Sequence, residues 1–326
     1  AFISLLSGFF SESFRVKLWD MIFTLPNPLL TQGSSDFSFG KTRRIIMLVP
    51  MRAILDAADK NGYAQGAFNV NAVCQVKAAV DVHQILRSPA IIQGADLANG
   101  FMGGRTDFAN STLEDKKAGA KNIGAAVKKY AADSDIPVAL HLDHGKNFDS
   151  CIAAIEGGYT SVMIDGSSLP FDENVELTRE VVKYAHERGV TVEGELGVLA
   201  GVEDHVFAAT STYTNPLSAI DFFKKTGVDA LAISYGTMHG ANKGKNAVIR
   251  KEIAIAIKEC MLHEGIEGYL VSHGSSTVPQ YIVEEINALG GEITNAYGID
   301  VDQISTYGLE DILSSIQKAK ENEQIK

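Results

Sequence analysis

Short apolar runs alternate with amphipathic stretches along most of the chain. From Gly66 onward, a run rich in β-branched residues is repeatedly followed by a turn and then by apolar positions at helical spacing. The apolar runs predict strands over residues 67–71, 89–94, 137–145, 161–166, 190–197, 230–236 and 269–274. The stretches between them predict helices, among them residues 72–86, 174–188, 216–226, 251–263 and 278–289.

Near-continuous apolar strands that alternate with helices are typical of a parallel sheet covered on both faces. A doubly wound sheet and a closed barrel both satisfy this pattern. Seven consecutive units without a break in composition favour an α/β fold of the parallel (β/α) TIM-type barrel class. The carboxyl ends of barrel strands meet at one face, where active sites lie. The residues at the predicted strand ends are therefore the candidates for chemistry.

The two ends of the chain depart from this pattern. Residues 1–46 contain seven of the fifteen Phe residues and the single Trp, and they match neither a secretory signal nor a transit peptide. We predict that residues 1–46 are an extension and that residues 47–326 form the barrel domain. After residue 300 the sequence becomes polar, and no eighth apolar run is recognisable.

Composition and charge narrow the class of protein. An apolar content of 45% is ordinary for a globular enzyme. The net charge of −11 argues against nucleic acid or an anionic membrane as a partner, although a local site can still bind a phosphorylated substrate. No apolar run is long enough to span a membrane. The three cysteines are widely spaced, which favours a reducing cytoplasm over a disulfide framework.

Five of the eight histidines have ordinary explanations. His83, His186 and His263 fall within predicted helices, where a solvated or hydrogen-bonded role is common. His205 lies in a loop and remains open. His141 lies inside the third predicted strand, where we expect a hydrogen-bonded barrel residue rather than a metal ligand.

The other three histidines share a pattern that indicates a metal site. His144, His239 and His273 end or closely follow predicted strands three, six and seven, and each is followed at once by glycine. Because these strand ends converge on one face, the three imidazoles fit the three protein ligands and one open position of catalytic zinc. The glycines allow close backbone approach and conformations that a side chain would forbid.

Acidic residues accompany these histidines. Asp143 directly precedes His144, so both can serve the site only if the strand breaks there. Glu193 and Glu195 share one face of the fifth strand by period-two spacing, and a buried polar network is the alternative explanation for both. Glu203 follows a glycine-bearing loop that could act as a lid, and the alternative is a solvated loop residue.

Several motifs taken together resemble the class II fructose-bisphosphate aldolases. The resemblance covers about residues 47–300 in order. The motifs are Gly-Ala-Phe-Asn-Val-Asn (66–71), His-Leu-Asp-His-Gly (141–145), Ser-Val-Met-Ile-Asp (161–165), Glu-Gly-Glu-Leu-Gly (193–197), Gly-Thr-Met-His-Gly (236–240) and His-Gly-Ser-Ser (273–276). A set of this length and order is highly specific.

The resemblance implies a role for each of the main candidates. His144, His239 and His273 would be the ligands of one catalytic Zn²⁺, and Glu195 would lie near an alternative metal position. Asp143 would be the acid/base for the C4 hydroxyl.

Further roles follow from the same resemblance. Glu203 would be the loop acid that takes the proton from the triose. The residues implied at the substrate or its phosphates are Asn69, Gly240, Lys243, Gly274 and Ser276. A monovalent cation near the phosphate site, a small phosphorylated sugar substrate and a homo-oligomeric assembly are implied as well.

Zinc-dependent cleavage of fructose 1,6-bisphosphate to dihydroxyacetone phosphate and glyceraldehyde 3-phosphate is the reaction expected from this resemblance. Zinc would act as a Lewis acid toward the charge that develops on the triose half, while Asp143 moves the C4 hydroxyl proton. The other known solution uses a Schiff-base lysine. The predicted strands carry no lysine, and Lys243 lies in a loop, so the metal route is favoured.

Two departures from the family bear on activity. A serine usual after the second strand is replaced by Ala95, and the family's eighth strand, which supplies phosphate contacts, has no recognisable counterpart. We therefore expect an incomplete, truncated barrel that keeps its zinc site. The apolar run at residues 45–49 is not expected to fill the gap, because Pro50 follows it.

Three other functions remain open. A tagatose-bisphosphate aldolase would differ only in contacts that the sequence does not reveal. A zinc-binding but inactive truncated homologue fits the missing strand. A barrel phosphatase or epimerase with a histidine-rich metal site fits the three histidines but leaves Asp143 and Glu203 unexplained.

Overall fold

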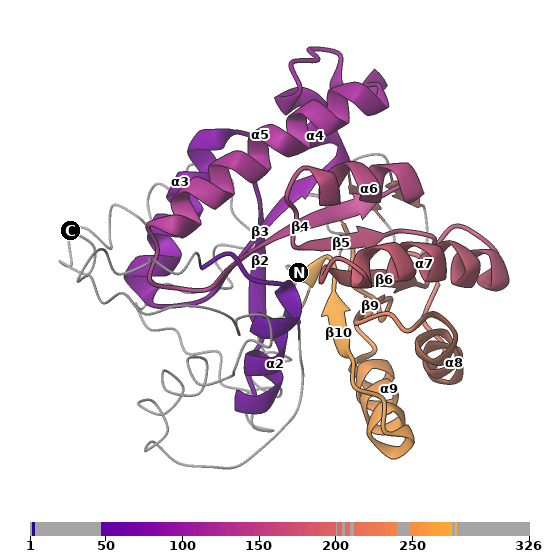
Figure 1. The fold of residues 1–326 in the computed structure, drawn as a ribbon. Helices are drawn as coiled ribbons and strands as arrows, with labels where there is room; N and C mark the ends of the chain where they lie inside the picture. The colour runs from indigo at the N-terminus through magenta and orange to yellow at the C-terminus, as the bar shows by residue number, and fades with distance from the viewer. Residues whose placement is uncertain are drawn as a thin grey trace, which may run out of the picture.

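The computed structural model describes residues 2–3, 47–199, 201–203, 206–208, 212–239, 248–275 and 278. Seven parallel strands curl into a barrel that is surrounded by helices (Figure 1). In spatial order the strands are β2 (Gln65–Asn69), β3 (Ala90–Ala95), β4 (Val138–Gly145), β5 (Ser161–Ile164), β6 (Thr191–Leu196), β9 (Ala230–Ile233) and β10 (Tyr269–Ser272). Each predicted strand overlaps one of these, so the predicted barrel class is confirmed.

The seam between β10 and β2 is occupied by β1 (Phe2–Ile3), a two-residue strand from the start of the chain. Phe2 pairs with Ser272 on one side and with Gly66 on the other, both in antiparallel register. The described strands thus form a closed ring through β1, which the sequence did not predict. The expected absence of an eighth parallel strand concerns residues 279–326, which lie outside the described residues.

Residues 47–49, the described part of the apolar run before Pro50, lie beside β4 rather than in this seam. Leu48 forms a bridge with Val138 at the start of β4, and the Val49 N–H donates to the Val138 carbonyl at 2.8 Å. Residues 45 and 46 of the same run lie outside the described residues.

Helices surround the strands and cover one end of the barrel (Figure 1). They are α2 (Met51–Asn61), α3 (Val73–Leu86), α4 (Asp96–Met102), α5 (Leu113–Ala132), α6 (Phe148–Glu156), α7 (Phe171–His186), α8 (Pro216–Thr226) and α9 (Lys251–Glu264). Three predicted helices match α3, α8 and α9 to within a residue at either end. The helix predicted from residue 174 begins earlier, at Phe171, because Pro170 precedes it and acidic Asp172 and Glu173 favour its first turn. The helix predicted over 278–289 lies outside the described residues apart from Val278.

Buried apolar side chains form two clusters, one on each side of the barrel wall. The larger cluster lies between the strands and the outer helices. The smaller one fills the barrel interior, where Met51, Ile54 and Leu55 of α2 pack against inward-facing residues such as Ile91 and Met163. Helix α2 therefore closes the amino-terminal end of the barrel, and the carboxyl-terminal end is left for polar side chains.

Candidate active site

Three histidines meet at the carboxyl-terminal end of the barrel. The ligand atoms of His144, His239 and His273 all lie within 4.8 Å of one another, and all three side chains are buried. Their rings pack edge to face, with centroids 4.7 to 5.8 Å apart. The structure thus brings together the three residues that the sequence pattern singled out.

A break in β4 lets the strand present two consecutive side chains to the site. The pairing of β4 with β5 shifts register between Leu142 and Gly145, and His144 adopts a φ of 48°. Left-handed backbone costs a residue other than glycine about 1–2 kcal/mol. Gly145 then packs so tightly against β5 that an added Cβ would lie 2.5 Å from the Met163 carbonyl oxygen. The break explains how Asp143 and His144 can both face the same centre.

Two carboxylates surround His144. Its Nδ1 lies 3.1 Å from Asp165 Oδ2 and 3.7 Å from Glu195 Oε2. Burial alone would lower the pKa of His144, but the Asp165 hydrogen bond and the nearby carboxylates raise it to about 10. Burial and the Asp165 charge raise the pKa of Glu195 to about 8. His144, Asp165 and Glu195 form a second group with ligand-like spacing.

His239 follows β9, and its pKa is shifted in the opposite direction to that of His144. Burial, together with the charges of His273 and His144, lowers the pKa of His239 to about 3. A neutral imidazole is the form that binds a metal ion. Because three buried imidazoles in mutual contact are the donor set of catalytic zinc, the residues present fit a zinc ion.

His273 is held by a carboxylate on β6, which is separated from β10 by one strand, β9. Its Nε2 lies 2.9 Å from Glu193 Oε1, and the other oxygen of Glu193 lies 3.4 Å from Nε2 of His141. His141 in turn contacts the Ser161 hydroxyl at 2.8 Å through Nδ1. His141 is therefore a hydrogen-bonded barrel residue, in keeping with its place inside a strand.

Asp143 and Asn69 lie next to the histidine cluster. The Asn69 side-chain amide donates to Asp143 Oδ2 at 2.8 Å, and Asp143 Oδ1 is buried with no hydrogen-bond partner. Burial would raise the pKa of Asp143, but His144 and His273 lower it below its ordinary value. Asp143 is therefore held as a carboxylate beside the three imidazoles, while Asn69 is exposed on the open face of the barrel.

The structure describes the remaining candidates only in part. Glu203 ends β7 (Gly201–Glu203), which pairs with β8 (Val206–Ala208) in a small hairpin, and its side chain lies outside the described part. Gly240, Lys243 and Ser276 lie outside the described residues. Gly274 has a φ of 60°, and an added Cβ would lie 2.4 Å from the Met238 carbonyl oxygen. A glycine is therefore required there by backbone packing, whatever its relation to phosphate.

Sequence reasoning did not assign site roles to Asp165 or His141, and it left Glu193 between two explanations. Asp165 ends a strand in Met-Ile-Asp-Gly, a signal of the same kind as the strand-end histidines. His141 and Asp143 share the inward face of β4 by period-two spacing, which could have placed His141 near the cluster. The partner that each acid contacts depends on barrel geometry, which no local pattern contains.

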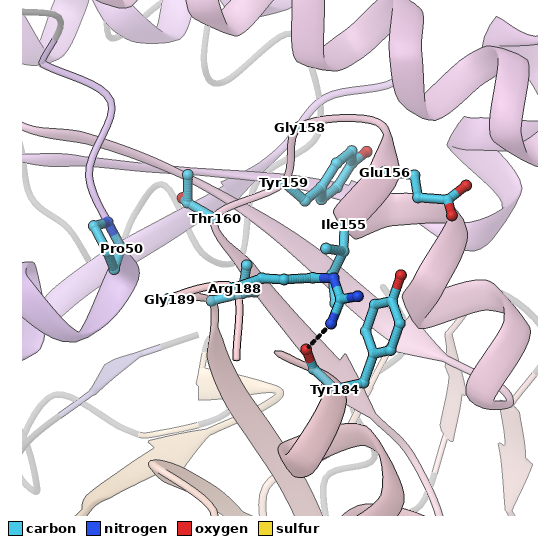
Figure 2. A pocket seen from close by; sticks show the side chains of 10 residues that line it. Pro50, Ile155, Glu156, Gly158, Tyr159, Thr160, Tyr184, Arg188 and Gly189 are labelled. Carbon is cyan, nitrogen blue, oxygen red and sulfur yellow. Dashed lines mark hydrogen bonds between the residues drawn. The ribbon is translucent and has the colours of Figure 1, made fainter. Parts of the chain in front are cut away.

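A separate surface hollow lies at the other end of the barrel (Figure 2). It has a volume of about 530 Å³ and is lined by residues that precede β5 and β6, including Thr160 and Val190. Arg188 lies over the Tyr184 ring, 3.5 Å from its centroid, and donates to the Tyr184 carbonyl at 2.8 Å. None of the three clustered histidines lines this hollow, so we place the chemistry at the carboxyl-terminal end.

The fold and the site define a (β/α)-barrel protein with three clustered histidines that could hold a metal ion and an adjacent buried carboxylate. The sequence model of the family described as fructose-bisphosphate aldolase class-II matches residues 49–322. The chain belongs to the class II fructose-bisphosphate aldolase family, and it is by that membership a class II aldolase, a lyase.

Curated relatives agree with this assignment. A fructose-bisphosphate aldolase of Treponema pallidum (strain Nichols) is 42% identical over 270 residues, which cover 79% of this chain and 77% of that protein. A fructose-bisphosphate aldolase of Giardia intestinalis is 41% identical over 258 residues, covering 79% of this chain and 74% of that protein.

Solved structures share the fold. A putative fructose-1,6-biphosphate aldolase from Coccidioides immitis superposes with a TM-score of 0.62 at 23% identity, covering 82% of this chain and 92% of that chain. The YdjI aldolase from Escherichia coli K12 gives a TM-score of 0.59 at 25% identity, covering 83% and 92%. The resemblance inferred from the sequence motifs is confirmed.

Proposed function

We propose that this chain catalyses the zinc-dependent, reversible cleavage of fructose 1,6-bisphosphate to dihydroxyacetone phosphate and glyceraldehyde 3-phosphate, a step of glycolysis and gluconeogenesis. The observation that carries the proposal is the meeting of three buried histidines with Asp143 at the carboxyl-terminal end of the barrel. The names of the curated relatives support the choice of substrate.

His144, His239 and His273 would hold the zinc ion. When bound there, zinc supplies Lewis-acid stabilisation of negative charge on the substrate oxygens. Asp143 removes the proton of the C4 hydroxyl in cleavage and returns it in condensation. Asn69 donates to Asp143 and thereby holds the carboxylate toward the open end of the barrel.

Glu203 takes the second proton-transfer role in the proposal. It ends one strand of the β7–β8 hairpin, which follows β6, the strand that carries Glu193 and Glu195. A carboxylate on a connection that follows a barrel strand can approach a bound triose from the open face. Glu203 would exchange the triose proton with solvent.

The alternative to metal-dependent cleavage is covalent catalysis by a Schiff-base lysine. Among the described strands of the barrel, none carries a lysine. Removal of metal by a chelator should abolish cleavage, and addition of Zn²⁺ or Co²⁺ should restore it. Borohydride with dihydroxyacetone phosphate should leave the protein mass unchanged. A borohydride adduct on any lysine, or full activity in the metal-free protein, would contradict the proposal.

The substrate epimer requires its own measurement. Fructose 1,6-bisphosphate and tagatose 1,6-bisphosphate differ at one carbon, and the described side chains do not distinguish them. Cleavage rates for both substrates, measured on the same metal-loaded sample, decide between the two aldolases. If neither substrate is cleaved while zinc is bound, the chain is a metal-binding homologue without this activity.

Three further properties belong to the proposal. A cytoplasmic location is supported by Cys74, Cys151 and Cys260, which are all free thiols. None of the described helices has the length and apolar character needed to cross a bilayer. Homo-oligomerisation and a monovalent cation near the phosphate rest on family resemblance, and light scattering and potassium-dependent kinetics test them.

A further inference from the structure

Glu193 lies between two histidines inside the barrel, below the level of the proposed metal. Its exposed fraction is 1%, and it faces inward from the middle of β6. One carboxylate oxygen lies 2.9 Å from His273 Nε2 and the other lies 3.4 Å from His141 Nε2. A buried carboxylate in an apolar barrel is costly unless hydrogen bonds compensate it, so both contacts matter.

We propose that Glu193 is a positioning residue that fixes the tautomer and the orientation of His273, and that Ser161 and His141 hold Glu193 in place. The inference deepens the proposed function and rests on it for the identity of the metal. It assigns a role to a chain of four residues, Ser161–His141–Glu193–His273, which crosses the barrel beneath the three-histidine cluster.

The direction of the hydrogen bonds follows from the chemistry of the groups. A carboxylate accepts hydrogen bonds and does not donate them, so the imidazole nitrogen that is hydrogen-bonded to Glu193, Nε2 of His273, carries the proton. His273 therefore has its hydrogen on Nε2, and the Nδ1 lone pair is directed away from Glu193. His141 contacts the Ser161 hydroxyl through Nδ1 at 2.8 Å and places its Nε2 3.4 Å from the other oxygen of Glu193, a contact that does not form a hydrogen bond.

This arrangement makes His273 a preformed ligand with Nδ1 as the metal-binding nitrogen. His144 has the opposite arrangement, because Asp165 contacts its Nδ1 and leaves Nε2 on the side away from that carboxylate. Carboxylates that hydrogen-bond a ligating imidazole raise its basicity and lock its ring, and removing them typically costs 10–100-fold in metal affinity. The rings of His273 and His144 are therefore each oriented by a different carboxylate.

Metal affinity tests the proposal without relying on catalysis. The 326-residue wild type is compared with Glu193→Ala and with Glu193→Gln, which keeps the side-chain volume, in competition with a chelator for Co²⁺. Both variants should bind Co²⁺ on the order of 10–100-fold more weakly, with an altered visible absorption band. Equal affinity and an unchanged band in both variants would overturn the proposal.

Asp229→Asn is the matched control for loss of a buried acid. Asp229 is also a buried carboxylate with two cationic or imidazole partners, Arg52 and His186, but it lies at the amino-terminal end of β9. Its variant should lose thermal stability and keep the Co²⁺ affinity of the wild type. A comparable loss of affinity in this control would show that general destabilisation, rather than positioning, explains the Glu193 variants.

The tautomer can also be observed directly in the metal-free protein. Long-range ¹H–¹⁵N spectra of wild type labelled with ¹⁵N-histidine should show His273 with its hydrogen on Nε2, and Glu193→Gln should change that pattern. A wild-type His273 protonated on Nδ1 overturns the inference. Absence of metal binding in the wild type would instead contradict the proposed function, and the tautomer measurement would still decide the role of Glu193.

Discussion

His144 shows how one backbone conformation creates the site. A regular strand would direct Asp143 and His144 to opposite faces of the barrel wall. The φ of 48° at His144 and the register shift that ends at Gly145 turn both side chains inward. The order Asp-His-Gly predicts such a break. The hydrogen bond between His144 and Asp165 is not predictable in this way, because it joins residues 21 positions apart on neighbouring strands.

Replacement of Asp143 by Asn tests the proposed acid/base. The asparagine amide keeps the shape of the Asp143 side chain and its contact with Asn69, but it cannot take a proton. The cleavage rate should therefore fall by on the order of 10²–10⁴. Zinc content, measured by elemental analysis, should stay at the wild-type level. Asp172→Asn, an exposed acid in the first turn of α7, serves as the control and should keep the parental rate. Loss of an acid/base should lower the cleavage rate by more than roughly tenfold. A rate for Asp143→Asn above roughly one-tenth of the wild-type rate would therefore contradict the assignment.

Replacement of Glu203 by Gln separates the two proton transfers. Exchange of the dihydroxyacetone phosphate proton with solvent deuterium should slow by on the order of 10²–10⁴, since the proposed base is lost. The exchange is followed by NMR in the absence of aldehyde. If exchange continues at the parental rate, Glu203 is an ordinary solvated residue of the β7–β8 hairpin.

At the scale of elements, α2 stabilises the barrel from its amino-terminal end. Met51, Ile54, Leu55 and Ala58 form its buried face, and the first three belong to the interior cluster. Truncation of Leu55 to Ala should lower the free energy of unfolding by about 2–5 kcal/mol, because it leaves a cavity among strands that cannot collapse freely. Lys60→Ala, on the exposed side of the same helix, should change it by less than about 0.5 kcal/mol. Chemical denaturation of both variants makes the comparison, and equal values would show that α2 is not part of the core.

His186 at the end of α7 pairs with Asp229, which directly precedes β9. This pair makes the stability of the fold depend on pH. His186 Nε2 lies 2.8 Å from Asp229 Oδ2, and this hydrogen bond raises the pKa of His186 although burial opposes it. Stability from a raised histidine pKa is complete below about pH 6.5 and is lost as the pH rises through the folded-state value. Burial would raise the pKa of Asp229, but hydrogen bonds from His186, the Val192 N–H and Arg52 lower it. The stability that Asp229 contributes is therefore lost as the pH falls through its folded-state pKa.

The difference between wild type and His186→Gln isolates this contribution. Free energies of unfolding measured from pH 5.5 to 9 should converge as the pH rises, because the wild type loses its advantage while the variant has none. The difference should be modest, since the His186 side chain is 41% exposed and solvent screens the pair. A constant difference across the range would rule out the titration of His186 as its cause.

At the scale of the whole molecule, the periodicity of apolar residues predicts the strands and helices. It does not predict which strands pair or which side chains meet across the barrel. Seven apolar runs predicted seven parallel strands, and the helices at 72–86, 216–226 and 251–263 follow from their spacing. β1 could not be predicted, because two residues carry no period and antiparallel pairing to β10 and β2 is a property of the assembled barrel. The same limit applies to Glu193, whose two partners come from β4 and from the end of β10.

The seam of the barrel provides the test of this closure. Phe2 and Ile3 pair with both β10 and β2, so each flanking strand has partners that an open edge would lack. Proline has no N–H to donate, and an unpaired edge promotes association between molecules. Replacing Phe2 and Ile3 together by Pro should therefore lower the melting temperature and increase the sedimenting mass. The matched control replaces both residues by Ala, which keeps the backbone donors and should have the smaller effect. Equal melting temperatures and equal sedimentation for the two double variants would mean that hydrogen bonds from β1 do not close the barrel.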